Sequence, residues 1–198
     1  MIRLALDTSF HFLTLALFED DTLLASIQKP AYKQQSETIL SELDSLFRSV
    51  GLKPESIQEL IVTHGPGSYT GLRIAMTIVK ILGSISKIHV YTLSSLLVLA
   101  GLEPQVSILI DARAERVYYA RYDQGKALIE DCVIPLSEAK ALIQKDDNLY
   151  GHLSLLGMED RWPDYALNFI LLKEFWIKVE SIHTLAPRYL KEHSAYHS

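Results

Sequence analysis

An apolar strand that ends in aspartate occurs twice in this chain, as LALDTS at residues 4–9 and as ILIDAR at residues 108–113. Each copy opens a run of short apolar segments that alternate with polar residues, a pattern typical of β-strands. After the first copy the pattern continues as two more strands, a helix, a strand, a helix and a strand. This repeated order predicts an α/β fold built by degenerate duplication, with a mixed sheet in each half.

The two sets of elements differ in length. Residues 1–102 hold the larger α/β set, and residues 103–198 hold a smaller set with a hairpin around 123–126 and a short strand near 148–152. Helices are expected at residues 36–50, 70–84, 93–102 and 164–178. No low-complexity linker separates the halves, so we expect two apposed lobes, and the final segment could return to the first lobe.

Composition narrows the class of protein. With 198 residues, 48% of them hydrophobic, the chain can bury one good core or two small ones. Its net charge of −5 argues against a broad basic surface for nucleic acid. Cys132 is the single cysteine, which excludes an internal disulfide and suits a reducing cytosol. We expect no membrane span and no signal peptide, and therefore a cytoplasmic protein.

The most distinctive local motif is HGPGSYTGLRIAMTIVKIL at residues 64–82, a glycine-rich turn that leads into a helix. Such a turn can aim backbone amides at a phosphate, or it can simply connect a strand to a helix that Ser68 or Thr70 caps. It lacks the Gly-Lys-Ser/Thr of a Walker loop, and the simple turn is favoured. Residues that could hold a nucleotide are Asp7, Gly65, Gly67, Ser68 and Asp111.

The helix behind this loop is apolar over far more than half of its circumference. Its polar residues form one narrow stripe, consisting of Arg73, Thr77, Lys80 and Ser84. A surface helix needs an apolar arc of only somewhat over about 100°. This helix is therefore either enclosed within the protein or covered on one face by another chain.

Other reactive residue types favour structural roles. His64 has no nucleophile paired with it in sequence, and the acids beside Cys132 would raise the pKa of its thiol. His193 and His197 have a metal-ligand spacing, but they lie at a chain end that is poorly suited to a preorganised site. Alternation places Tyr118 and Tyr122 on one face of a strand and Tyr119 on the other, as in ordinary sheet packing.

Four motifs in register, LALDTS, GPGSYTGLRIA, IDARAERVYYARYD and LAPRYLK, resemble those of the bacterial TsaB (YeaZ) family. The resemblance covers nearly the whole chain. It implies the actin-like/Hsp70-type (ASKHA) fold of two α/β lobes, in which this chain looks short between about residues 150 and 186. Gln35 also departs from the family, whose members often have histidine at this position.

The resemblance implies a non-catalytic partner of the enzyme TsaD, which transfers threonylcarbamoyl to the adenosine next to the tRNA anticodon. A TsaE-like ATPase would join the complex, tRNA would be contacted indirectly, and the chain alone would form a homodimer. TsaD has a His-x-x-x-His metal site, and Thr92 and Leu96 stand at the matching positions here. We therefore expect no catalytic residue, no metal site and no cofactor, with ATP or ADP bound only within the complex.

By the same resemblance, the helices at 36–50 and 70–84 would form a four-helix interface with the partner. The contact residues expected there are Ile39, Leu43, Leu72, Met76, Val79 and Lys80. The alternative is an independent nucleotide hydrolase of actin-like fold that uses Asp7, Gly65, Gly67 and Asp111. Saturable ATP binding by the isolated chain would distinguish this alternative.

Overall fold

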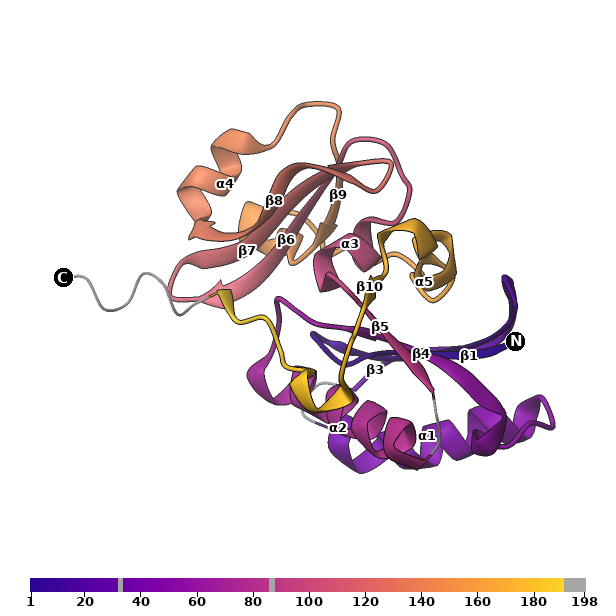
Figure 1. Ribbon diagram of the computed structural model, residues 1–198. Helices are drawn as coiled ribbons and strands as arrows, with labels where there is room; N and C mark the ends of the chain where they lie inside the picture. Colours follow the sequence, from indigo (N-terminus) through magenta and orange to yellow (C-terminus); the bar gives the residue numbers. More distant parts are fainter. Residues whose placement is uncertain (32–33, 86–87, 191–198) are drawn as a thin grey trace.

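A computed structural model describes residues 1–31, 34–85 and 88–190 and places the strands in two sheets (Figure 1). The first sheet has the order β10-β5-β4-β1-β2-β3, and the second has the order β8-β7-β6-β9. The strands of the first sheet are β1 (Ile2–Asp7), β2 (Phe12–Glu19), β3 (Thr22–Pro30), β4 (Ile57–Thr63), β5 (His89–Leu93) and β10 (Ile177–Lys178). Those of the second are β6 (Val106–Arg113), β7 (Arg116–Asp123), β8 (Lys126–Pro135) and β9 (Asn148–Gly151).

The two sheets repeat one strand order, which confirms the expected duplication. In the first lobe β1, β2 and β3 pair antiparallel, and β4 returns parallel to β1. In the second lobe β6, β7 and β8 pair antiparallel, and β9 returns parallel to β6. The first sheet continues to β5, whereas β9 is the last strand of the second sheet. The second lobe is therefore the shorter copy.

Helices cover both sheets and confirm the α/β, actin-like fold class. They are α1 (Gln35–Ser49), α2 (Tyr69–Ile85), α3 (Ser95–Ala100), α4 (Leu136–Leu142) and α5 (Asn168–Leu171). In Figure 1, α1 and α2 cover the outer face of the first sheet, and α3 and α5 lie between the two sheets. Helix α4 packs on β7 and β8 of the second sheet.

The broad apolar surface of α2 is explained by three neighbours. The helix packs on β4 and β1 of the first sheet, touches α1 on one side, and meets the short 3-10 helix η4 (Ile182–Thr184). Leu185 and Ile182 belong to the same hydrophobic cluster as Met76 and Val79 of α2. Most of the apolar arc is thus buried inside the chain, and the chain's own C-terminal part covers one of its sides.

The helices expected at 36–50 and 70–84 are confirmed, but the structure corrects the other two helices that were expected. Residues 164–178 do not form one helix: α5 is followed by the 3-10 helix η3 (Lys173–Phe175) and then by β10. The helix expected at 93–102 is shorter, because Leu93 ends β5 and the Ser94 hydroxyl caps α3 by accepting hydrogen bonds from two backbone amides. The strand that ends near Asp111 is followed by a tight turn, and β6 and β7 form a hairpin.

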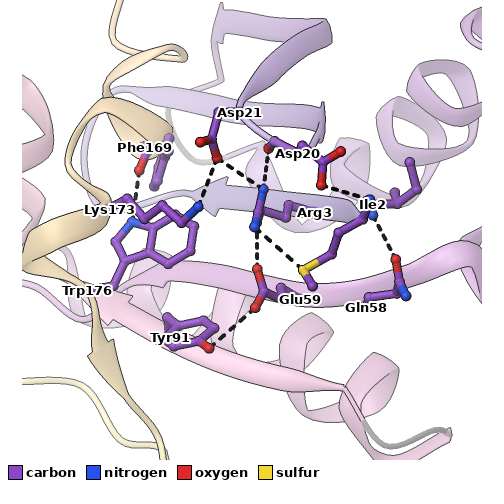
Figure 2. A network of polar contacts seen from close by, with 11 residues as sticks. Ile2, Arg3, Asp20, Asp21, Gln58, Glu59, Tyr91, Phe169, Lys173 and Trp176 are labelled. Atoms are coloured by element: carbon purple, nitrogen blue, oxygen red, sulfur yellow. Dashed lines mark hydrogen bonds and ion pairs between the residues drawn. The ribbon is translucent and has the colours of Figure 1, made fainter.

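Residues 162–190, called here the C-terminal segment, cross from the second lobe back over the first. The indole of Trp176 lies against the ring of Tyr91, at 5.1 Å between centroids, and β10 pairs with β5. Figure 2 shows the polar contacts around this junction, where Arg3 Nε donates to Glu59 Oε2 over 2.5 Å and Lys173 Nζ donates to Asp21 over 2.9 Å. The C-terminal segment is therefore anchored to β5 and to the turn between β2 and β3.

Within the described part of the chain, none of the helices is both long enough and apolar enough to cross a lipid bilayer.

Candidate partner-binding surface and interlobe cleft

The glycine loop packs tightly on the turn that follows β1. A Cβ added to Gly67 would lie 2.7 Å from the carbonyl oxygen of Ser9, so only glycine fits there. The backbone amide of Ser68 donates to that same oxygen over 2.8 Å, and the amide of Gly71 donates to the Ser68 hydroxyl over 3.2 Å. The loop thus uses these amides for internal bonds and lets Ser68 cap α2.

Asp7 is buried, with 2% of its surface exposed, and its carboxylate is satisfied within the chain. Oδ1 accepts hydrogen bonds from the amide and hydroxyl of Ser9 and from the hydroxyl of Thr63. Oδ2 accepts a hydrogen bond from the hydroxyl of Tyr165 over 3.0 Å. Both oxygens are engaged, so a metal-bound nucleotide would have to displace bonds that hold the C-terminal segment.

A cleft of about 570 Å³ lies between the lobes and brings together three of the five candidate nucleotide residues. Its lining includes Gly67, Ser68 and Asp111, whereas Asp7 and Gly65 do not line it. Residues that the sequence interpretation missed also face the cleft, and they come from both lobes: His11, Tyr69, His152 and Tyr189. No spacing rule could find this set, because its members are separated by up to most of the chain.

Two polar contacts order the second-lobe side of the cleft. The carboxylate of Asp111 accepts a hydrogen bond from the backbone amide of Arg113 over 2.8 Å. The backbone amide of Asp111 donates a hydrogen bond to Nδ1 of His152 over 3.1 Å. Nε2 of His152 therefore carries the proton when the ring is neutral. Burial lowers the pKa of His152, and the carboxylates of Asp160 and Asp111 partly oppose that shift.

The other titratable residues singled out in the sequence have structural surroundings. His64 lies beside a crevice of about 400 Å³, and burial together with Arg188 lowers its pKa to about 4. Burial and Asp131 raise the pKa of the Cys132 thiol. Among the residues described, no group of three or more His, Cys, Asp or Glu could hold a metal ion. His193 and His197 lie outside the described residues.

The positions matched to the TsaD metal ligands are filled by packed side chains. Thr92 is 7% exposed at the end region of β5, and Leu96 is fully buried in α3. The side-chain amide of Gln35 donates a hydrogen bond to the carbonyl of Phe10 over 3.1 Å. These residues hold elements together.

The apolar residues chosen from the sequence as partner contacts are mostly buried within this chain, although Leu43 also lines the groove described below. All have 8% or less of their surface exposed: Ile39, Leu43, Leu72, Met76 and Val79. Lys80, the sixth, is half-buried. Leu40 of α1 and Ile81 of α2 are instead exposed by 65% and 53%. Periodicity located the two helices, but it could not say which side of a helix faces the chain's own sheet.

An apolar groove of about 610 Å³ runs between the two helices at this surface. Leu40, Phe47, Ile78 and Ile81 line it, and Asp44 with Arg48 stands at its edge. The Asp44–Arg48 ion pair, at 2.9 Å, joins residues one turn apart on α1. The groove, with the exposed side chains of Leu40 and Ile81, forms an apolar surface that none of the described residues covers.

An aromatic and cationic cluster lies at the N-terminal end of α2. The Arg73 guanidinium stacks on the Tyr69 ring at 4.2 Å, and its Nε donates to the Tyr189 hydroxyl over 3.1 Å. The rings of Tyr69 and Tyr189 stack at 5.1 Å with 22° between their planes. The cluster joins the C-terminal segment to the first turn of α2.

Comparisons with known proteins agree with this architecture. The family model described as "TsaD: tRNA N6-adenosine threonylcarbamoyltransferase" matches residues 27–148. The "tRNA threonylcarbamoyladenosine biosynthesis protein TsaB" of Bacillus subtilis is 34% identical over 137 residues, which cover 67% of this chain and 60% of that protein. The protein of the same description from Buchnera aphidicola subsp. Acyrthosiphon pisum is 21% identical over 194 residues, covering 94% of this chain and 87% of its own length.

Two solved structures share the fold over nearly the whole chain. The structure described as "YeaZ from Pseudomonas aeruginosa" superposes with a TM-score of 0.76 at 23% identity and covers 96% of this chain and 99% of its own. A second structure, described as an uncharacterized protein with similarity to peptidase YEAZ from Pseudomonas aeruginosa, gives a TM-score of 0.80 at 22% identity with the same coverage. The likeness includes both lobes.

Proposed function

Because the chain belongs to the TsaB (YeaZ) family, we propose that it serves tRNA threonylcarbamoyladenosine biosynthesis as a non-catalytic subunit that binds a TsaD-type transferase. A part in this biosynthesis follows from the family. The scaffold role is supported above all by the uncovered apolar groove between α1 and α2. A partner helix laid along that groove would remove Leu40 and Ile81 from water, which is the usual source of interface stability.

The filled positions of Thr92 and Leu96 support the non-catalytic part of the proposal. A hydroxyl and a buried aliphatic side chain do not supply the imidazole ligands that a divalent iron or zinc site uses. Transferase chemistry would then belong to the partner, and this chain would stabilise the partner's fold or orientation. A TsaE-like ATPase and tRNA would meet the complex mainly through that partner.

We propose no cofactor for the isolated chain. Asp7 spends both carboxylate oxygens on internal hydrogen bonds, and the amide of Ser68 is bound to Ser9. A nucleotide hydrolase would need these groups for metal and phosphate. Calorimetry with the isolated chain and millimolar ATP·Mg²⁺ should show no saturable heat of binding. Saturable binding that Asp7→Ala abolishes would instead favour the nucleotide hydrolase.

The scaffold proposal is tested by Ile81→Asp and Leu40→Asp, each mixed with the TsaD-type protein of the same organism. Burying an unpaired carboxylate in the groove should weaken heterodimer formation by about 30-fold or more. The same variants should also weaken the homodimer that we expect the chain to form alone. Both side chains are exposed, so thermal unfolding should change little.

Leu128→Asp is the matched control, because Leu128 of the second lobe is 52% exposed, close to the 53% of Ile81. It should leave association unchanged when measured by gel filtration with light scattering. Wild-type protein that stays monomeric and ignores the transferase would refute the proposal. If the Ile81→Asp and Leu128→Asp variants bound the transferase with equal affinity, the interface would lie on another face of the chain.

A further inference from the structure

The exposed face of α2 carries cations and no acid. The helix spans Tyr69–Ile85, a stretch with no aspartate or glutamate, and its charged residues are Arg73 and Lys80. Among the described residues, no carboxylate lies within ion-pair distance of either one. The chain as a whole has a net charge of −5, whereas this helix face is positively charged.

Arg73 is held in place before any partner arrives. Tyr69 supports the face of the guanidinium at 4.2 Å, and the Tyr189 hydroxyl accepts from Nε over 3.1 Å. None of the residues that the structure describes bonds to the terminal nitrogens of the exposed guanidinium, and these nitrogens match the two oxygens of a carboxylate. Because the two rings already restrict the side chain, pairing would cost less conformational entropy than it does for a free surface arginine.

These cations adjoin the apolar groove along the same helix. Ile81, which lines the groove, follows Lys80 directly, and Arg73 lies two turns earlier on the exposed side. Helix α1 contributes a balanced pair, Asp44 with Arg48. A partner that covers the groove and extends along α2 therefore meets the apolar side chains of Ile78 and Ile81 and the positive charges of Lys80 and Arg73.

We propose that the partner helix facing α2 is acidic, with carboxylates placed to bind Arg73 and Lys80, and that this charge match favours the heterologous partner over a second copy of this chain. The inference rests on the proposed function. Arg73 and Lys80 are seven residues apart, so an antiparallel pairing of α2 with its own copy, centred near Met76 and Thr77, would set Arg73 of each copy opposite Lys80 of the other. Two such contacts of like charge weaken the homodimer, whereas carboxylates on a different partner stabilise the heterodimer.

The test measures both equilibria for wild type, Arg73→Glu and Lys80→Glu between about 0.05 and 0.5 M salt, a range over which surface attraction is progressively screened. The heterodimer with the TsaD-type protein should weaken as salt rises, and the homodimer should tighten. Arg73→Glu should weaken the heterodimer by about 30-fold or more and tighten the homodimer, because a glutamate would then face Lys80. Tyr189→Phe, which keeps the ring and removes the acceptor for Nε, should give a smaller loss.

Lys140→Glu on the exposed side of α4 is the control, since it changes net charge by the same amount in the other lobe. Arg73→Glu that binds the transferase as tightly as Lys140→Glu, or a heterodimer that is insensitive to salt, would overturn the acidic-partner inference and leave the scaffold proposal intact. If the wild type did not bind the transferase at any salt concentration, the proposed function would be refuted, and this inference with it. Arg73→Lys should retain the salt dependence but lose part of the affinity, because lysine lacks the guanidinium fork.

Discussion

At the scale of single residues, Asp7 shows how a polar group can mark a fold without serving as a reactive site. Its carboxylate ends β1 and accepts four hydrogen bonds, from the amide and hydroxyl of Ser9, from Thr63 and from Tyr165. A buried carboxylate is tolerated only when donors satisfy its oxygens. Ser9, two residues away, could be anticipated as a partner from turn chemistry. Tyr165 could not, because no local rule relates residues 158 positions apart.

His64 makes stability depend on pH in a defined direction. Burial, assisted by Arg188, lowers its pKa from an ordinary 6.5 to about 4. Below pH 6.5 the unfolded chain binds a proton that the folded chain does not, so unfolding becomes easier as the pH falls from about 6.5 to about 4. Over that range the loss in the free energy of unfolding should reach about 3 kcal/mol, because each pH unit between the two pKa values contributes about 1.4 kcal/mol.

Urea unfolding of wild type and His64→Gln at pH 7.5, 5.5 and 4.5 checks this expectation. The variant should lose less stability than wild type between the first and last of these pH values, because glutamine does not titrate. His152 has a lowered pKa as well, so only the difference between the two proteins reports on His64. Parallel pH curves for the two proteins would show that His64 titrates normally.

At the scale of elements, the β6–β7 hairpin turns without the residues that usually mark such a turn. Ala114 and Glu115 occupy the turn with φ of +52° and +56°, and Arg113 before them has φ of +69°. Two-residue hairpins of this kind favour Asn-Gly or Gly-Gly, because left-handed backbone costs other residues about 1 kcal/mol or more. The sequence DARAER contains no such residue, so the usual turn signal is missing.

Glu115→Gly should therefore stabilise the protein by about 0.5–1 kcal/mol, since glycine adopts this backbone without a Cβ clash. The exposed side chain is expected to contribute little of its own. Chemical denaturation should show a higher midpoint with an unchanged slope. As a control, Leu24→Gly on β3, where the backbone is extended, should instead lower the free energy of unfolding. If Glu115→Gly destabilised the protein, the side chain of Glu115 would contribute more to stability than relief of the left-handed backbone does.

Helices α1 and α2 were predictable because apolar residues recur at helical spacing along each of them. Local capping residues also mark an end of each helix: Gly51 follows α1, and Ser68 precedes α2. The helix expected at 164–178 was wrong for a reason that lies outside the segment. Phe169 and Trp176 have helical spacing, yet Trp176 turns back so that its indole nitrogen donates to the carbonyl of Phe169 over 2.9 Å. This leaves Ile177 and Lys178 free to pair with β5. Tertiary pairing thus overrides a weak local preference.

At the scale of the whole molecule, the C-terminal segment binds the first lobe at points far apart on its surface. The Tyr165 hydroxyl donates a hydrogen bond to Asp7, and β10 pairs with β5 at the edge of the sheet. The amide of Arg188 donates to the carbonyl of His64. The Tyr189 hydroxyl accepts a hydrogen bond from Arg73 of α2. The motifs predicted two lobes and their order, because each lobe carries its own strand pattern. They could not predict these contacts, which depend on how the lobes face one another.

The Arg3–Glu59 pair provides the sharpest test of how this segment is held. Arg3 is 5% exposed and Glu59 is 7% exposed, and Arg3 lies 5.9 Å from the centre of the Trp176 ring (Figure 2). Removing one member leaves the other charge buried without its partner, so Arg3→Ala should destabilise the protein by about 3–5 kcal/mol. Replacing both, with Met at 3 and Leu at 59, should recover most of that loss, because it removes the unpaired charge and keeps the volume.

The neighbouring Lys173–Asp21 pair is the natural comparison, because its side chains are 45% and 67% exposed. Lys173→Ala should cost about 0–1 kcal/mol, as exposed ion pairs do. Urea unfolding followed by tryptophan fluorescence measures all these variants, since Trp176 lies at the junction. Hydrogen exchange at β5 and β10 should then rise in Arg3→Ala more than in Lys173→Ala if the buried pair holds the segment. Equal costs for the two single variants would mean that the segment is held by its apolar packing and strand pairing, with the buried ion pair contributing no more than an exposed one.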